Sequence, residues 1–167
     1  MSETFYYKSP LGYLQIVASK NRITGVTFMS KDYELLHKDS KYKSTSSAAL
    51  EKCINELDAY FSGKNLQFSV PFRQEGTAFQ QNVWESLLSI PAGQTSSYMA
   101  LSKKLGNAKA IRAVGIANGK NKLALLVPCH RVIGSNGTMV GYAGEVWRKQ
   151  WLLQHEAKHC NGVRELF

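Results

Sequence analysis

The hydrophobic pattern changes its period along this chain of 167 residues, and that change constrains the fold more than any other feature. Between residues 5 and 28, short aromatic and β-branched runs are separated by turn residues, a pattern typical of an antiparallel β meander. From residue 50 onward, apolar residues recur every three or four positions, as on one face of a helix. The polar stretch 65–75 contains Pro71 and forms the natural linker. The pattern therefore predicts an α+β chain of two domains, residues 1–75 and 76–167.

The first domain is expected to combine the antiparallel sheet with one helix. The helical stripe from Leu50 to Phe61 stops before Gly63, a residue suited to end a helix. Cys53 lies on this stripe, and we interpret it as a small buried hydrophobe without a chemical role.

The second domain is expected to be mainly helical. Thr77 and Gln80 have the spacing of a capping box. Two short helices, over 98–105 and 108–118, meet at a turn that contains Gly106 and make a helix-turn-helix candidate of the winged-helix type. Residues 123–127 are expected to form a short buried strand. Residues 146–159 are expected to form a last helix whose inward face carries Trp147, Trp151 and Leu152.

Positive charge is concentrated in the second domain. The chain has a formal net charge of +9; residues 77–167 hold 11 Lys and Arg against 4 Asp and Glu, whereas residues 1–76 hold 10 against 8. No acidic residue occurs from Thr95 to Pro128. Charge this one-sided is typical of proteins that bind a phosphate backbone. The basic side chains of this stretch are Lys103, Lys104, Lys109, Arg112, Lys120 and Lys122.

The cysteines and the apolar runs indicate the compartment. Three widely spaced cysteines do not make a disulfide framework, and they favour a reducing environment in which a thiol stays available as a nucleophile. No apolar run approaches the roughly 20 residues of a membrane span, and the N-terminus lacks the features of a secretory signal. We expect a cytoplasmic protein without a membrane association.

The segment Pro128-Cys129-His130-Arg131-Val132 resembles the active-site signature of the O6-alkylguanine-DNA alkyltransferases, also called methylated-DNA–protein-cysteine methyltransferases. The rest of that family's pattern occurs in order around it and covers about half of the chain closely. The further matching segments are residues 76–84, 90–93, 97–98, 112–115, 117–119, 121, 141–144 and 152–156. The resemblance implies a ribonuclease-H-like first domain and a second domain that binds DNA and transfers the alkyl group.

The implied chemistry requires a strong nucleophile. A thiol with the ordinary pKa of about 8.5 is mostly protonated near neutral pH, and an adjacent imidazole can take its proton. The resemblance implies that Cys129 is the nucleophile and alkyl acceptor, that His130 reaches its thiol through a water molecule, and that Glu156 orients His130. Without the resemblance, His130 would be a structural histidine and Glu156 a surface carboxylate.

Further residues match the family's substrate site. Tyr98 corresponds to the tyrosine that acts at N3 of the guanine, where the leaving group needs a proton or a hydrogen bond. Asn121 corresponds to an asparagine that braces the helix pair against the active-site strand; the alternative is a plain turn residue. Val132, Tyr142 and Ala143 are expected to line the pocket, with donors to O6 near the last two.

The resemblance also implies that the nucleotide is flipped out of the duplex. Arg112 corresponds to the arginine that enters the base stack, the alternative being a phosphate contact. The second helix of the pair is expected to face the minor groove, with small residues at Ala110, Ala113 and Gly115 for close approach. Ile111 and Ile116 are larger than the small residues expected on this helix. We assign Lys103, Lys104, Lys109 and Arg131 to DNA contacts as well.

Together these features predict DNA repair by direct, irreversible transfer of an alkyl group from O6-alkylguanine in double-stranded DNA to Cys129, with O4-alkylthymine left open. A non-catalytic lesion-binding or helix-turn-helix regulatory protein is one alternative, and a thiol hydrolase that turns over is another. We expect a monomer without a cofactor or a metal, since the C-terminal His155, His159 and Cys160 make a weak site. In a prokaryote it would accompany the nucleoid, and in a eukaryote it would be nuclear.

Overall fold

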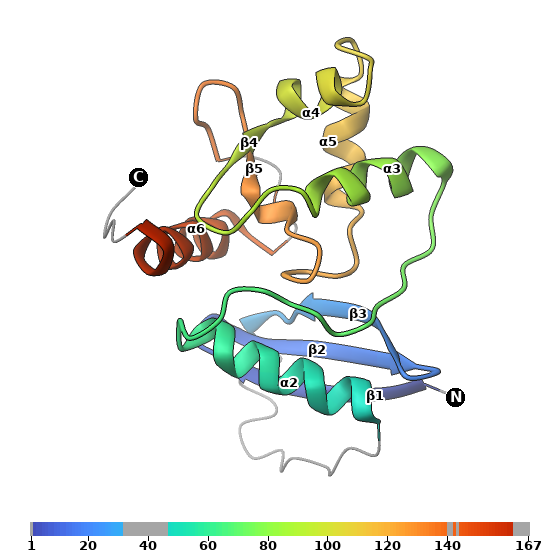
Figure 1. Ribbon diagram of the computed structural model, residues 1–167, viewed down its shortest axis with the longest axis vertical. Helices are drawn as coiled ribbons and strands as arrows, with labels where there is room; N and C mark the ends of the chain where they lie inside the picture. The colour runs from blue at the N-terminus through green and yellow to red at the C-terminus, as the bar shows by residue number, and fades with distance from the viewer. Residues whose placement is uncertain (1, 32–46, 140–141, 143, 162–167) are drawn as a thin grey trace. The chain divides into compact units, whose positions relative to one another are not determined.

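The computed structural model describes residues 2–31, 47–139, 142 and 144–161 (Figure 1). The chain forms two compact units, Met1–Gln74 and Glu75–Phe167. The first holds an antiparallel sheet with a helix, and the second is mainly helical, so the α+β class predicted from the change of hydrophobic period is confirmed.

The sheet of the first unit is a meander of three antiparallel strands, β1 (Ser2–Ser9), β2 (Gly12–Ser19) and β3 (Arg22–Phe28), in that order. The turn between β2 and β3 places Lys20 and Asn21 in the left-handed region, with φ of 49° and 58°. Asparagine tolerates this region better than most residues. The Asn21 side chain also accepts a hydrogen bond from the Ala49 amide at 2.9 Å, which ties the turn to the following helix.

Helix α2 (Ala48–Phe61) packs along the sheet (Figure 1). Ser47 caps its first turn, and the Tyr7 hydroxyl of β1 donates to the Asp58 carboxylate at 2.6 Å. Cys53 is completely buried, as predicted, and burial, reinforced by the charge of Glu56, raises the pKa of its thiol to about 12. This thiol is therefore chemically inert in the folded protein.

The second unit begins with α3 (Ala78–Leu87), whose predicted capping box is confirmed: Thr77 and Gln80 satisfy each other's backbone amides. Gly76 precedes the box because a Cβ there would lie only 2.5 Å from the ring of Trp84. The Trp84 indole N–H donates to the Ala117 carbonyl at 2.9 Å, which joins α3 to the helix that contains Ala117.

The predicted helix pair is present as α4 (Tyr98–Lys104) and α5 (Ile111–Gly119). Ser97 caps α4, and Gly106 takes a φ of 83° in the turn after it. The second helix begins three residues later than predicted, because the Asn107 side chain and carbonyl accept from the amides of Lys109 and Ala110 and hold residues 107–110 in a turn.

The strand predicted over residues 123–127 is wrong, although the segment is buried as expected. Leu125 has a φ of 71°, and the Val127 amide donates to the Leu123 carbonyl at 2.9 Å, so the segment folds back on itself as a compact turn. Two strands of two residues occur instead, β4 (Ser96–Ser97) and β5 (Val132–Ile133), paired in parallel.

Helix α6 (Val146–Asn161) closes the unit, and Leu152 is buried as predicted while Trp151 is half-buried. The inward placement of Trp147 is wrong: its side chain is 42% exposed, and its indole N–H donates to the Glu145 carboxylate at 2.5 Å. In the part of the chain that the structure describes, no helix combines the length and apolar character needed to cross a membrane.

Candidate active site

The parallel pair β4–β5 assembles the site from two distant parts of the chain. Ser96 pairs with Val132 and Ser97 with Ile133. Tyr98 follows β4 directly, and the segment Cys129–Arg131 precedes β5 directly. The pairing therefore holds the phenol of Tyr98 beside the segment that carries the thiol.

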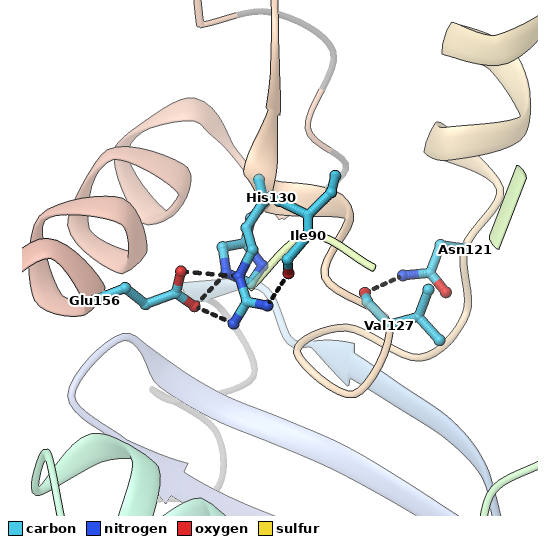
Figure 2. A network of polar contacts seen from close by, with 6 residues as sticks. Ile90, Asn121, Val127, His130 and Glu156 are labelled. Carbon is cyan, nitrogen blue, oxygen red and sulfur yellow. Dashed lines mark hydrogen bonds and ion pairs between the residues drawn. The ribbon is translucent and has the colours of Figure 1, made fainter. Parts of the chain in front are cut away.

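Cys129 begins a single 3-10 turn, η1 (Cys129–Arg131). The residue is 6% exposed. Two asparagines hold its segment. The Asn118 side chain donates to the Cys129 carbonyl at 3.3 Å. The Asn121 side chain donates to the Val127 carbonyl at 2.9 Å, as Figure 2 shows. The nucleophile candidate is thus fixed through the backbone on both sides.

The electrostatic surroundings of the Cys129 thiol act in opposite directions. Burial raises its pKa above the ordinary value, while the Asn121 side chain, the positive charge of Lys149 and nearby backbone amides lower it in part. The thiol is protonated at neutral pH, so a base that removes its proton is needed before it can act as a nucleophile.

His130, Arg131 and Glu156 form a buried network (Figure 2). His130 Nε2 lies 2.7 Å from Glu156 Oε1, and Arg131 donates to both carboxylate oxygens, each at 2.9 Å, and to the Ile90 carbonyl at 2.7 Å. Burial by itself would raise the pKa of Glu156, but His130 and Arg131 hold it well below the usual range. The carboxylate is therefore ionised and accepts a hydrogen bond from Nε2 of His130. In the neutral imidazole, Nδ1 is then the acceptor.

The prediction that Arg131 contacts DNA is wrong. Its residue is only 7% exposed, and its guanidinium is bonded to Glu156 and Ile90. Its carboxylate partner lies 25 residues away in the sequence, on α6, where spacing gives no indication of it.

The remaining predicted pocket residues have different degrees of burial. Tyr98 is half-buried. Burial and the charge of Cys129 raise the pKa of its phenol, and a hydrogen bond with the Asn118 side chain lowers it only in part. Burial raises the pKa of Tyr142 well above the ordinary value. Val132 is completely buried, and Ala143 lies outside the described residues. Both phenols are protonated donors at neutral pH.

The predicted DNA-binding side chains lie on the helix pair. Arg112 and Ala113 are exposed on α5, Ala110 and Gly115 are half-buried, and Gly115 lies beside the ring of Tyr98. Ile116 is 59% exposed, four residues after Arg112 and on the same helix face. The exposed lysines of α4 and of the turn are Lys103, Lys104 and Lys109.

Two residues of the site had no predicted role. Asn118 is 2% exposed, and its side chain donates to the Cys129 carbonyl. Lys149 is completely buried, with its ammonium 6.0 Å from the ring centroid of Tyr98, and burial lowers its pKa to about 8. The sequence could have indicated Lys149, because its spacing places it on the same inward face of α6 as Leu152 and Glu156, where a lysine is unexpected.

The geometry of the second unit defines a class of protein: a helix-turn-helix domain with a basic exposed face and a buried thiol next to a His–Glu pair. Among the described side chains, no group of three His, Cys, Asp or Glu residues is placed to hold a metal ion.

Comparison with known proteins identifies the family. Residues 78–158 match the DNA-binding domain of 6-O-methylguanine DNA methyltransferase, and residues 4–74 match its ribonuclease-like domain. The chain is 38% identical over 159 residues to the methylated-DNA–protein-cysteine methyltransferase of Mycobacterium tuberculosis, covering 95% of this chain and 94% of that one. It is 43% identical over 141 residues to the constitutive enzyme of that name from Bacillus subtilis, covering 82% and 84%.

A solved structure agrees with this result. The Mycobacterium tuberculosis OGT crystallised in complex with DNA superposes with a TM-score of 0.80 at 37% identity, covering 92% of each chain. This chain belongs to the 6-O-methylguanine DNA methyltransferase family, the methylated-DNA–protein-cysteine methyltransferases.

Proposed function

We propose that this protein repairs alkylated DNA by direct reversal, and that Cys129 accepts the alkyl group from O6 of guanine. Family membership makes it a methylated-DNA–protein-cysteine methyltransferase, and DNA is its partner. The observation that carries the residue assignment is the buried His130–Glu156 pair next to the Cys129 thiol. A DNA-binding regulator would have no use for a buried, ionised carboxylate that orients an imidazole beside a thiol.

The first step removes the thiol proton. Because the Glu156 carboxylate accepts from His130 Nε2, Nδ1 of His130 is the free base of the pair. We infer that a water molecule carries the proton from Sγ of Cys129 to this nitrogen. Glu156 then stabilises the imidazolium, and Arg131 keeps the carboxylate in place through two hydrogen bonds.

The second step transfers the alkyl group. The thiolate attacks the alkyl carbon, an S–C bond forms, and the C–O6 bond breaks with its electron pair going to the guanine. The phenol of Tyr98, whose raised pKa keeps it protonated, donates to N3 of the leaving base. The product is a thioether, which is a very poor leaving group, so each molecule reacts once.

The lesion reaches the thiol only if the nucleotide leaves the duplex. The proposed substrate is double-stranded DNA that carries O6-alkylguanine, and the proposed stack-inserting residue is Arg112, exposed on α5. Lys103, Lys104 and Lys109 would neutralise phosphates, and Ala110, Ala113 and Gly115 would permit close approach. We propose that residues 76–167 carry these functions, that the protein acts as a monomer, and that it works in the compartment of the chromosome.

The experiment is a mass measurement on the intact protein after it is mixed with an oligonucleotide that contains O6-methylguanine. The mass should rise by one methyl group per molecule, and peptide mapping should locate it on Cys129. Cys129→Ala should abolish the gain while duplex affinity changes little. Cys160→Ala, which removes an exposed cysteine, is the matched control and should transfer normally. Methyl gain in the Cys129→Ala variant, or many turnovers per molecule, would rule the mechanism out.

A further inference from the structure

One large apolar side chain stands out on the outer face of α5. This face is formed by residues at helical spacing, Arg112, Gly115, Ile116 and Gly119. Ile116 is 59% exposed, more than any other large apolar side chain that the structure describes as exposed. A single exposed isoleucine needs no explanation by itself, so its neighbours decide what it can contact.

The neighbours of Ile116 indicate that DNA approaches this face closely. The adjacent Arg112 is an exposed cation, as is Lys109 just before the helix, and DNA is the partner of the protein. The fold itself does not require the two glycines. A Cβ at Gly119 would meet open space, and one at Gly115 would lie 3.9 Å from the ring of Tyr98, an ordinary contact. Glycine within a helix costs stability relative to alanine, so their small size serves the approach of the partner.

We propose that Ile116 enters the minor groove as an apolar wedge and makes repair depend on the base step beside the lesion. This inference rests on the proposed function, in which Arg112 takes the place of the extruded nucleotide. Ile116 lies about 6 Å further along the helix axis, or roughly two base steps of DNA. Apolar side chains that enter the minor groove partly unstack the step they contact. Isoleucine suits this role because its branched Cβ leaves essentially one rotamer in a helix, so it loses little freedom on binding.

The cost of unstacking depends on the sequence of the contacted step. Pyrimidine–purine steps such as TA and CA unstack easily, whereas A-tracts are stiff. Because α5 has a direction, from Arg112 to Ile116, the wedge contacts the DNA on one side of the lesion only. Flexible steps should therefore speed repair on that side and have little effect on the other. An effect of flexible neighbours on extrusion itself would act from both sides.

The test measures single-turnover rates of methyl transfer from duplexes that carry one O6-methylguanine. The duplexes differ only in the two steps upstream or the two steps downstream of the lesion, which are either flexible or part of an A-tract. The wild-type protein should react about tenfold faster with flexible steps on one side and about equally on the other. Ile116→Ala should bring the ratio on the sensitive side close to one. The side chain is exposed, so the variant keeps the packing of the core.

Ile111→Ala is the matched control. Ile111 is an isoleucine of the same helix and 37% exposed, but it precedes Ile116 by five residues and lies on a different side of α5. This variant should keep the wild-type ratio. Binding to an unmodified duplex gives a second readout. Ile116→Ala should weaken it without changing its salt dependence, because an apolar contact releases no counterions, whereas Lys103→Ala should reduce that dependence.

Equal wild-type rates with flexible and stiff steps on both sides, or a one-sided preference that persists in Ile116→Ala, would overturn the inference. Absence of methyl transfer from every duplex would instead overturn the proposed function, so the two failures are distinguishable.

Discussion

Glu156 is the residue on which the active-site network depends. It is completely buried and ionised, and both His130 and Arg131 are bonded to it. Glu156→Gln removes the charge and leaves the Arg131 guanidinium buried without a counterion. We expect a loss of about 3–5 kcal/mol in the free energy of unfolding, the range for a broken buried ion pair. Urea titration measures it.

The pH dependence of this loss has a definite sign. The folded protein holds the pKa of Glu156 below its unfolded value, which is about 4.3. The stabilisation is therefore fully present above that pH and is lost as the pH falls through the lowered pKa. The difference between wild type and Glu156→Gln should shrink on acidification. Glu85→Gln on the exposed surface of α3 is the control, and an equal effect there would contradict the prediction.

Lys149 supplies positive charge to the thiol. Its charge lowers the pKa of Cys129, and its own pKa is about 8 because burial disfavours the charged form. In Lys149→Met the thiol pKa should rise, and reaction with free O6-benzylguanine should slow below pH 8. As the pH rises through about 8, wild-type Lys149 loses its proton and the two rates should converge. Rate–pH profiles measure this effect.

The control is Lys158→Met, on the exposed part of the same helix, which should follow the wild-type profile. If the ratio of the wild-type rate to the Lys149→Met rate stays constant across the pH range, Lys149 has no part in activating the thiol.

At the scale of the element, α5 separates two kinds of DNA contact. If Arg112 enters the base stack, Arg112→Ala should slow repair of a duplex lesion far more than reaction with the free base, which needs no extrusion. The cost of extrusion is a few kcal/mol, about a hundredfold in rate if the side chain offsets most of it. The measured quantity is the ratio of the duplex rate to the free-base rate.

The matched control for Arg112 is Lys103→Ala, which removes an exposed cation from α4. It should weaken duplex binding modestly and reduce the dependence of binding on salt, as expected for a phosphate contact. If Arg112→Ala changes only the salt dependence, Arg112 is also a backbone contact and another residue of α5 holds the extruded nucleotide.

The elements that sequence predicts well are those decided locally. The capping box at Thr77, the strands of the meander and the start of α4 follow from side chains that interact with their own neighbours in the chain. The segment 123–127 is equally apolar but folds as a turn, in which Leu125 adopts a φ of 71° and the Val127 amide donates to the Leu123 carbonyl. The local preferences of these residues do not predict a positive φ at a leucine.

The site shows the same division between local and long-range information. Cys129 and His130 are adjacent and belong to a specific motif, so their importance is visible in the sequence. The burial of Arg131 depends on Glu156, 25 residues away in the sequence, and Asn118 takes its role from a bond to the Cys129 carbonyl, 11 residues away. Both are properties of three-dimensional contacts, and for that reason one was misassigned and the other missed.

At the scale of the whole molecule, most of the positive charge and the residues of the candidate site lie in the same part of the chain. Residues 77–167 carry most of the net charge of +9 as well as the thiol, the buried network and the helix pair. Electrostatic attraction to DNA therefore brings the reactive unit itself to the duplex. The first unit is nearly balanced in charge, and its inert Cys53 does not compete for the alkyl group.

The short pair β4–β5 determines when, during folding, the candidate site is assembled. It joins residues on either side of the entire helix pair, so the thiol and the phenol meet only after that long loop has closed. In a nascent or partly folded chain, Cys129 lacks its contacts with Asn118 and with the β4–β5 pair. If Cys129 is the alkyl acceptor, as we propose, its reactivity arises together with folding. Because each folded chain acts once, the cell's capacity to repair lesions equals its supply of molecules that have completed this closure and not yet reacted.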